Sequence, residues 1–145
     1  MAQVSTYLNF PSSTEAAFNF YKLVFKTEFS MPIGRFKDIP AQPRQPALSE
    51  ADKNLVMHVA LPILGGHVLM GTDAPESMGF TVKQGNNMYI NLEPDTRTET
   101  ERLFNALAAN GKVEMPLQEM FWGGYFGSLV DQFGVNWMFN CTSRI

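Results

Sequence analysis

The chain has 145 residues, of which 45% are hydrophobic and 12% aromatic, enough to bury the core of a compact protein. Only 17% are charged, and 11 Lys and Arg side chains against 14 Asp and Glu give a net charge of −3. Neither sign forms a long run, so the chain lacks the basic surface that binds nucleic acid. We expect no nucleic-acid partner.

One cysteine and the character of the first residues set the expected compartment. Cys141 has no second cysteine for an intramolecular disulfide, which suits a reducing environment. Residues 1–10 lack the basic and long apolar regions of a signal peptide. No stretch approaches the roughly 20 apolar residues of a membrane-spanning helix. We expect a cytoplasmic protein without membrane contact.

In chain order, the first expected element is a strand at residues 7–10, Tyr-Leu-Asn-Phe, whose side chains alternate in character. A helix should follow, because Ser12 and Glu15 have the spacing of a capping box. Phe20 and Leu23 supply apolar positions on this helix. Further strands of the first half are expected at residues 28–36, 55–63 and 67–72.

The second half of the chain repeats this order. Residues 89–92, Tyr-Ile-Asn-Leu, match residues 7–10, and Thr96 with Glu99 repeats the capping-box spacing. The second helix should end at Asn110, beside a glycine. The remaining strands are expected at residues 112–120, 125–130 and 134–138.

The offsets between the two copies locate an insertion. They are 82 residues at the first strand, 84 at the helix and 68 at the last strand, so the first copy is longer by roughly 14 to 16 residues. Proline-rich segment 37–53 is the expected site, and it is typical of a mobile loop. The sequence predicts one α+β domain, residues 1–145, built of two βαβββ units at about 1–75 and 84–145.

An ordered series of short motifs resembles a known superfamily. The motifs are Phe20-Tyr21, Met57-His58, Leu69-Met70-Gly71-Thr72-Asp73, Trp122-Gly123, Asp131-Gln132-Phe133-Gly134 and Trp137. Together they resemble the vicinal oxygen chelate superfamily, which includes glyoxalase I, extradiol dioxygenases, and fosfomycin and bleomycin resistance proteins. The chain is most similar to the branch named after a demethylubiquinone methyltransferase-like protein and a phosphonate-operon protein. That name does not imply methyl transfer, because the sequence has no Gly-rich nucleotide loop.

The resemblance implies a glyoxalase-like fold of eight strands and two main helices, in which each βαβββ unit curls into an incomplete barrel around a cleft. Such proteins are commonly homodimers, and a charged fraction of only 17% agrees with a surface partly covered by a second subunit. Fold alone does not define a function, so the site has to be argued separately.

The resemblance also implies four positions for a divalent metal ion, on the first and last strands of both units, where related enzymes place His, Gln or Glu. In this chain these positions fall on Tyr7, Tyr89, Met70 and Met138. A neutral phenol with a pKa near 10 is a poor metal ligand, and a thioether suits copper(I) far better than Mg, Mn, Ni or Zn. We expect no metal ion and no other cofactor.

The same strands should line a ligand pocket. Because alternate side chains share one face of a strand, Asn9 and Asn91 should lie beside the tyrosines, and Asn136 beside Met138. Trp122, followed by two glycines, is placed to stack on a planar ligand, although core packing or a dimer contact explains it equally well. The alternative is that these side chains simply fill the barrel. The expected pocket residues are Tyr7, Asn9, His58, Met70, Tyr89, Asn91, Trp122, Asn136 and Met138.

His58 is the best candidate for a catalytic base, since an unperturbed imidazole has a pKa near 6.5. It matches Phe126 in the second copy, so a structural histidine is the competing interpretation. Of the carboxylates of Asp73, Glu93, Glu114 and Glu119, most should be solvated. Asp131 should be a turn residue and Cys141 a buried small side chain.

The main functional hypothesis is a metal-independent protein that binds a small molecule, as bleomycin resistance proteins do. The alternative is a lyase, isomerase or dioxygenase acting on a small oxygenated substrate, with a displaced metal site or His58 as base. A third hypothesis is a dimeric interaction module whose cleft is filled.

Overall fold

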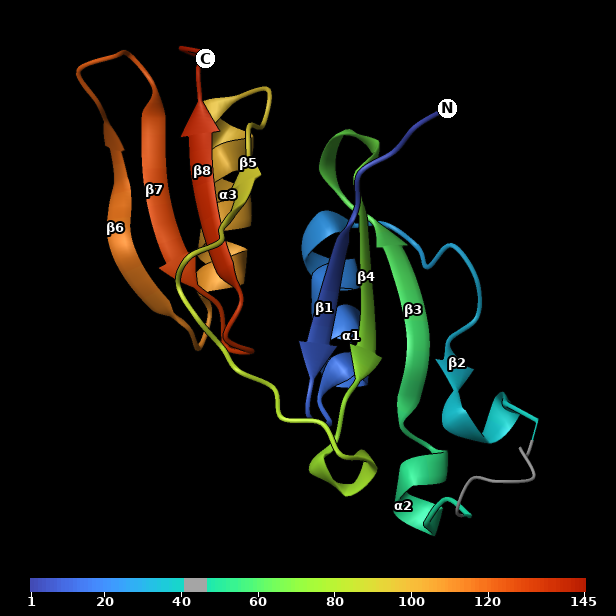
Figure 1. The fold of residues 1–145 in the computed structure, drawn as a ribbon. Helices are drawn as coiled ribbons and strands as arrows, with labels where there is room; N and C mark the ends of the chain where they lie inside the picture. The colour runs from blue at the N-terminus through green and yellow to red at the C-terminus, as the bar shows by residue number, and fades with distance from the viewer. Residues whose placement is uncertain (41–46) are drawn as a thin grey trace. The chain divides into compact units, whose positions relative to one another are not determined.

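The computed structural model describes residues 1–40 and 47–145. The chain divides into two compact units, Met1–Val82 and Lys83–Ile145 (Figure 1). Each unit has one four-stranded sheet and one long helix, which confirms the α+β fold with eight strands and two main helices. Neither sheet closes into a barrel. That both units form one domain stays a prediction.

The first unit is a sheet with strand order β1-β4-β3-β2, in which β1 runs parallel to β4. Its elements are β1 (Thr6–Phe10), α1 (Thr14–Phe25), β2 (Gly34–Arg35), β3 (Val56–Pro62) and β4 (Val68–Asp73). Ala17, Phe18 and Tyr21 of α1 are fully buried in the core. A Cβ at Gly71 of β4 would lie 2.5 Å from Phe18 Cε1, so glycine is required for this close helix–sheet packing.

The second unit repeats this topology with strand order β5-β8-β7-β6, and β5 runs parallel to β8. Its elements are β5 (Ile90–Leu92), α3 (Arg97–Ala108), β6 (Lys112–Glu119), β7 (Tyr125–Val130) and β8 (Asn136–Cys141). Leu103 and Leu107 of α3 are buried, as is Trp137 of β8. The Phe104 ring lies edge-on to Phe139, with 5.5 Å between the ring centroids. In each unit the helix covers one sheet face and leaves the other open.

The segment expected as a strand at residues 28–36 is mostly irregular, and only Gly34–Arg35 pairs as β2. The amide of Ser30 still donates to the carbonyl of Ala60 over 2.9 Å, so the chain follows β3 without forming a continuous ladder. Pro32 has no amide hydrogen and interrupts the ladder. The expected loop 37–53 contains part of η1 (Phe36–Asp38) and all of α2 (Glu50–Lys53), while residues 41–46 lie outside the described residues.

The helix starts are only partly as predicted. Thr96 is the N-cap of α3, and its hydroxyl accepts the amide of Glu99 at 3.1 Å, as expected. In α1 the N-cap is Ser13 instead of Ser12, and it makes no side-chain capping bond. The buried carboxylate of Asp73 accepts the amide of Thr14 at 3.0 Å instead. The prediction of a Ser12 capping box was therefore wrong.

Strand pairing corrects the repeat alignment at the first strand. In the first unit Tyr7 pairs with Met70, and in the second unit Asn91 pairs with Met138. The counterpart of Tyr7 is therefore Asn91, at an offset of 84 residues that equals the offset of the helices, and Tyr89 is not its counterpart. A shift of two residues keeps every side chain on its own face, so alternation alone could not distinguish the two alignments.

None of the helices in the described part of the chain combines the length and apolar character needed to cross a membrane.

Candidate ligand-binding faces

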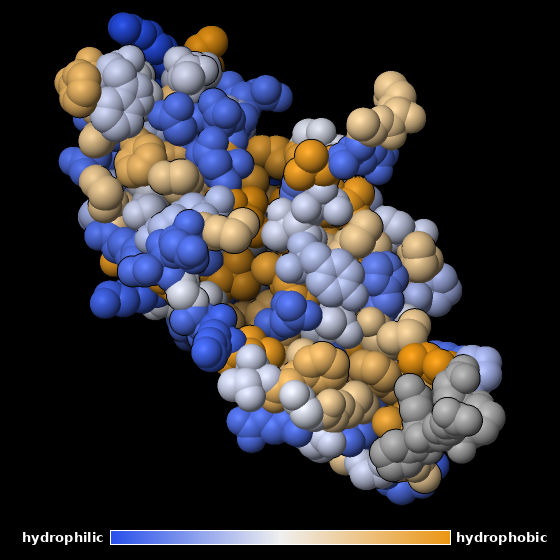
Figure 2. All heavy atoms as spheres, in the orientation of Figure 1, coloured by the Kyte–Doolittle hydropathy of each residue, from blue (hydrophilic) through white to orange (hydrophobic). Residues whose placement is uncertain are grey.

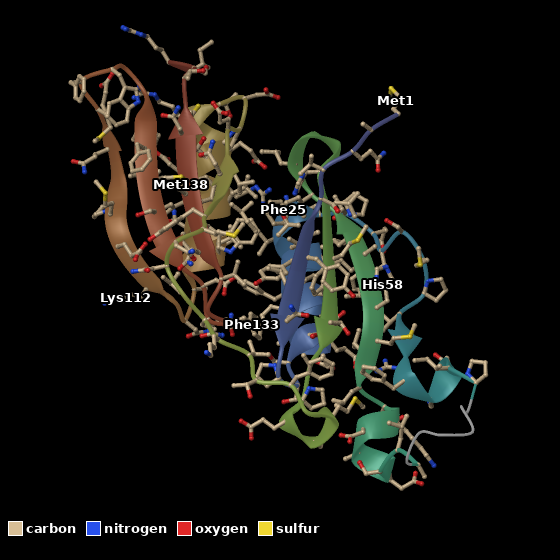
Figure 3. All side chains as sticks on the ribbon, in the orientation of Figure 1. Met1, Phe25, His58, Lys112, Phe133 and Met138 are labelled. Atoms are coloured by element: carbon tan, nitrogen blue, oxygen red, sulfur yellow. The ribbon has the colours of Figure 1, made fainter. Side chains whose placement is uncertain are left out.

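The open face of the first sheet carries Tyr7 and Asn9 from β1, and the register of β4 adds Met70 and Thr72 opposite them. Ala60 of β3 pairs with Met70 from the other side. Since residues two apart share a face, His58 of β3 lies on this side too. On the first unit, hydrophobic and hydrophilic side chains are mixed in the view of Figure 2, and Figure 3 labels His58 on β3.

Two aromatic side chains meet across the middle of this face. The Tyr7 and His58 rings have centroids 6.1 Å apart and are tilted by 31°. They come from β1 and β3, which flank β4, so the contact passes over the strand that carries Met70. Tyr7 is 50% exposed, and His58 and Met70 are half-buried. The face thus presents a phenol, an imidazole and a flexible thioether in one place.

On the open face of the second sheet, Met138 lies between Asn91 of β5 and Ser128 of β7. Trp122, from the loop between β6 and β7, is 50% exposed. Its indole Nε1 donates to Asn140 Oδ1 at 3.3 Å.

The Trp122 ring also stands edge-on to Phe126, with 6.0 Å between the ring centroids. A Cβ at Gly124 would collide with Asn140 Oδ1 and approach Trp122 Nε1, so this glycine lets the loop fold closely over the sheet. Phe126 corresponds to His58, so both faces carry an aromatic pair built on the same strand position.

Two expected pocket residues of the second unit, Asn136 and Tyr89, form hydrogen bonds with other residues of the same unit. Asn136 Nδ2 donates to the carbonyls of Gly85 and Met88, at 2.7 and 3.0 Å. The hydroxyl of Tyr89 donates to Glu114 Oε1 at 2.7 Å, and this hydrogen bond is the main reason why the pKa of the Tyr89 phenol is raised. Residues 84–89, which we call the strap, are thereby tied to β8 and β6.

The four positions at which the resemblance implies a metal ion change by one residue, because strand pairing makes Asn91, and not Tyr89, the counterpart of Tyr7. They fall on Tyr7 and Met70 in the first unit and on Asn91 and Met138 in the second. One phenol, one amide and two thioethers are a poor ligand set both for Mg or Mn, which take carboxylate, carbonyl and water oxygens, and for Zn, Ni or Fe, which imidazole suits. Across residues 1–40 and 47–145, no three His, Cys, Asp or Glu side chains gather in a way that could hold a metal ion.

The other singled-out acids and Cys141 are structural. Asp131 Oδ1 accepts the amides of Phe133 and Val135 at 2.8 and 3.1 Å, which confirms its turn role, and Oδ2 accepts Trp137 Nε1 at 2.9 Å. Cys141 is buried as expected. Asp73, one of the carboxylates of which most were expected to be solvated, is only 3% exposed and accepts amides from two elements.

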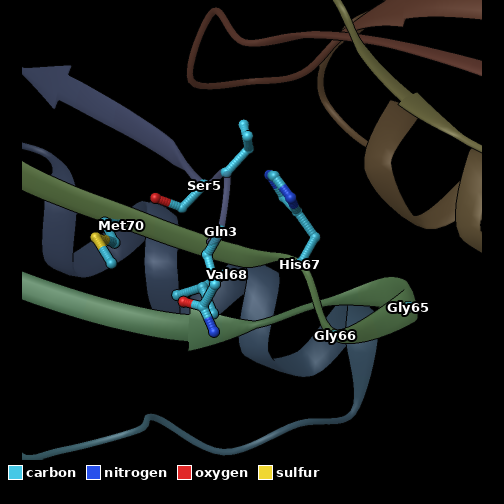
Figure 4. Close-up of a pocket in the computed structure, with 8 residues that line it drawn as sticks. Gln3, Ser5, Gly65, Gly66, His67, Val68 and Met70 are labelled. Carbon is cyan, nitrogen blue, oxygen red and sulfur yellow. The ribbon is translucent and has the colours of Figure 1, made fainter. Parts of the chain in front are cut away.

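A hollow of about 280 Å³ lies beside the start of β1 and the turn between β3 and β4 (Figure 4). Its lining includes Gln3, Val4, Ser5, Gly66, His67 and Val68. His67 Nε2 lies 2.9 Å from the hydroxyl of Thr6, a bond that gives this histidine a structural role.

Several residues of the two faces were not predicted from the sequence. Side-chain alternation, extended by two residues along each strand, would have found the polar ones. The missed residues are Ala60, Thr72, Ser128 and Asn140. The strap has no such signal, because residues 84–87 are Gln-Gly-Asn-Asn, a composition typical of any exposed connection.

Comparisons with known proteins agree with this architecture. A family model described as 3-demethylubiquinone-9 3-methyltransferase matches residues 2–139. Protein YjdN of Escherichia coli K12 is 30% identical over 150 residues, which cover 97% of this chain and 96% of that protein. The crystal structure of protein PA1353 from Pseudomonas aeruginosa has 33% identity and a TM-score of 0.80, over 97% of this chain and 98% of that chain.

A PhnB protein from Bacillus cereus has 27% identity and a TM-score of 0.72, over 97% of this chain and 99% of that chain. Solved structures described as glyoxalase/bleomycin resistance protein/dioxygenase share the fold at 12–19% identity. The chain therefore belongs to the family whose model is described as 3-demethylubiquinone-9 3-methyltransferase, and it shares its fold with the glyoxalase/bleomycin resistance protein/dioxygenase structures.

Proposed function

We propose that this protein binds a small organic molecule on the open side of its sheets and does so without a metal ion. The observation that carries the proposal is the chemistry of the four superfamily metal positions, which are Tyr7, Met70, Asn91 and Met138. Their phenol, amide and thioethers offer apolar contact and hydrogen bonds but few hard ligands. Such a surface suits an organic ligand better than a divalent cation.

The aromatic pairs support a ligand with a planar part. Tyr7 and Trp122 are each 50% exposed, although each also packs against a second ring. Exposed aromatic rings favour offset or edge-on contacts with another ring. The thioethers of Met70 and Met138 adapt to ligands of irregular shape, because methionine has three rotatable bonds. Asn9 and Asn91 are exposed on the same faces and can orient polar groups of the ligand.

Metal analysis combined with ligand screening tests this proposal. Purified protein should contain far less than one Ni, Zn, Mn or Fe per chain. A thermal-shift screen with catechols, planar antibiotics, and 2-oxoaldehydes plus glutathione should yield at least one stabilising compound. Its affinity should be the same with and without a chelator. One tightly held divalent ion per chain, lost together with ligand binding on chelation, would overturn the proposal.

A second candidate function is catalysis without a metal, with His58 as the base. It is favoured by the Tyr7–His58 contact, because a phenol and an imidazole side by side can share the donation and acceptance of protons. On this hypothesis His58→Asn abolishes turnover of a screened oxygenated substrate but leaves its binding nearly unchanged. In a pure binding protein the same substitution weakens binding, and no turnover exists to lose.

We further propose a cytoplasmic homodimer. A charged fraction of 17% and exposed apolar side chains on β6, such as Val113 and Met115, support a covered surface. The single cysteine, Cys141, is buried and suits a reducing compartment.

A further inference from the structure

The turns before the last strands of the two units are equivalent but carry different residues. Ile63 donates its amide to the carbonyl of His67 at 2.8 Å, and Asp131 does the same to Val135 at 2.9 Å. The residue after each turn is therefore Val68 in the first unit and Asn136 in the second. Both side chains lie on the open face, because each is two residues before Met70 or Met138.

Asn136 uses its amide to hold the strap across the second sheet. Asn136 donates to the carbonyls of Gly85 and Met88. A third hydrogen bond, of 3.0 Å, runs from Gln84 Nε2 to the carbonyl of Phe133. A Cβ at Gly134 would collide with the Gln84 side chain, so the strap lies directly against this turn. In Figure 1 the connection passes in front of β8 before it enters β5.

Tyr89 extends this attachment to the far edge of the sheet. Tyr89 immediately precedes β5, whereas Glu114 belongs to β6, and the sheet order places two strands between them. Adjacent strands are about 4.8 Å apart. The side chains of Tyr89 and Glu114 must therefore together cross the width of the sheet for their oxygen atoms to lie 2.7 Å apart. The strap end and Tyr89 therefore close one end of the second open face.

Within residues 1–40 and 47–82, the first unit shows no hydrogen-bonded closure equivalent to the strap. Val68 cannot donate a hydrogen bond to a passing backbone, and Met1 and Val4, which precede β1, are 117% and 85% exposed. The hollow of about 280 Å³ adjoins Val68, at the place where Asn136 holds the strap in the second unit. This face thus keeps free a region that the second unit fills with its own chain.

The strands of the first face carry polar groups that can donate as well as accept hydrogen bonds, and these strands place no acid on the face. The strands place Tyr7, Asn9 and His58 on this side, and none of the strand residues that share the face is Asp or Glu. Phenol, amide and imidazole N–H groups can all donate to an oxygen that carries negative charge. The second face differs, since its strap bond uses the carboxylate of Glu114.

We infer that the two copies have divided roles: the open face of the first unit accepts the ligand, a planar molecule with an anionic oxygen group, while the strap closes the second face. This inference rests on the proposed function and specifies which face performs it. The expected ligand contacts are Tyr7, His58 and Met70, with the anionic group directed toward the donors.

Methionine methyl groups provide a native reporter for each face. In protein labelled with [methyl-13C]methionine, Met70 reports the first face, Met138 the second and Met88 the strap, with signals assigned through Met70→Leu, Met138→Leu and Met88→Leu. The probe is 8-anilinonaphthalene-1-sulfonate, an aromatic anion with a planar naphthalene ring system. Its matched control is N-phenyl-1-naphthylamine, which has the same rings and no charge.

The sulfonate should shift the Met70 signal at concentrations at least about fivefold below those that shift Met138, as expected if even one net hydrogen bond must open on the second face. The neutral probe should bind the first face more weakly. If the sulfonate shifts the Met138 signal at a concentration equal to or lower than that which shifts Met70, the assignment of the ligand to the first face is overturned. If the neutral probe binds as tightly as the sulfonate, the preference for an anionic group is overturned. Failure of both probes to bind would overturn this inference, whereas the proposed function is judged separately by the metal analysis and compound screen.

Releasing the strap gives a second test, whose first readout, amide exchange, needs no ligand. In the double variant, Asn136→Val gives the second unit the residue type that Val68 supplies in the first and removes the bonds to the strap carbonyls. Tyr89→Phe removes the hydrogen bond to Glu114. Amides of residues 84–89 should exchange at least about fivefold faster, and Met138 should now respond to the sulfonate. Tyr89→Phe alone, the milder variant, should show the same direction. Unchanged exchange in a folded variant would contradict the closing role of the strap.

Discussion

Asp73 is a buried carboxylate that serves two elements at once. Oδ1 accepts the amide of Thr14 at the start of α1, and Oδ2 accepts the amide of Val56 at the start of β3. Its counterpart in the second unit is Cys141, which cannot do this. Asp73 therefore replaces the capping hydroxyl that the sequence pattern assigned to Ser12.

We expect Asp73→Asn to lower the free energy of unfolding by about 2 kcal/mol, because an amide offers one acceptor where the carboxylate offers two and leaves a buried N–H unpaired. Urea denaturation followed by circular dichroism measures the loss. Asp95→Asn, on an exposed aspartate, is the matched control and should change stability by less than about 0.5 kcal/mol. Equal effects of the two substitutions would contradict the dual role of Asp73.

His58 and Phe126 occupy equivalent strand positions, and the exchange of one for the other separates ligand contact from packing. We expect His58→Phe to fold normally but to weaken binding of a screened anionic compound about tenfold, since one charge-assisted hydrogen bond is lost. His67→Asn is the control, because His67 bonds to Thr6. Calorimetric titration of both variants measures the effect, and unchanged affinity in His58→Phe would exclude His58 from the site.

At the scale of elements, the two helices begin by different means. Thr96 caps α3 through its own side chain, whereas Ser13 makes no side-chain capping bond to α1. Thr96→Ala should therefore cost about 1 kcal/mol of stability, and Ser13→Ala should cost much less. Thermal and urea unfolding of both variants provide the comparison. A larger loss in Ser13→Ala would show that the capping assignment is wrong.

The ion pair between α1 and β2 gives the protein a predictable pH dependence. Both oxygens of Glu15 accept from Arg35, at 3.0 and 2.8 Å, and this bonding holds the pKa of Glu15 below its ordinary value of 4.5. A carboxylate whose pKa is lower in the folded state stabilises the fold above the unfolded-state pKa, and this stabilisation disappears as pH falls through the folded-state pKa.

Glu15→Gln should accordingly be less stable than the unmodified protein at pH 7, by about 0.5 kcal/mol after allowance for the partial exposure of the pair. The difference should shrink as the pH falls below 4.5, and it should also shrink in high salt. Urea unfolding at pH 7, 5 and 3 tests the sign. A difference that grows toward low pH would contradict the ion-pair mechanism.

At the scale of the whole molecule, each sheet is complete within its own unit, and no strand of one pairs with a strand of the other among the described residues. Light scattering coupled to gel filtration should give twice the chain mass of 16.3 kDa if the proposed homodimer forms. Val113→Glu, which introduces a negative charge on the exposed edge strand β6, is a first probe of the surface involved. A mass of one chain at micromolar concentration would contradict the dimer.

Local patterns predicted the fold well because each signal acts over a few residues. The capping spacing at Thr96 and Glu99, the alternation in β1, and the turn chemistry of Asp131 all appear in the structure as expected. The failures were the long strand at residues 28–36 and the Ser12 cap. The first depends on pairing with a distant strand, and the second on a carboxylate about 60 positions away.

The sequence by itself determined the duplicated α+β architecture and the family, because composition, spacing and motif order carry these properties. Tertiary structure alone decided that Asn91 is the counterpart of Tyr7, that Asp73 is buried, and that Asn136 and Tyr89 hold the strap. A strand shifted by two residues keeps the same side chains on the same face, so only hydrogen-bonded pairing fixes its register. In the same way, a polar connection acquires a role only when folding brings its carbonyls within reach of a distant amide.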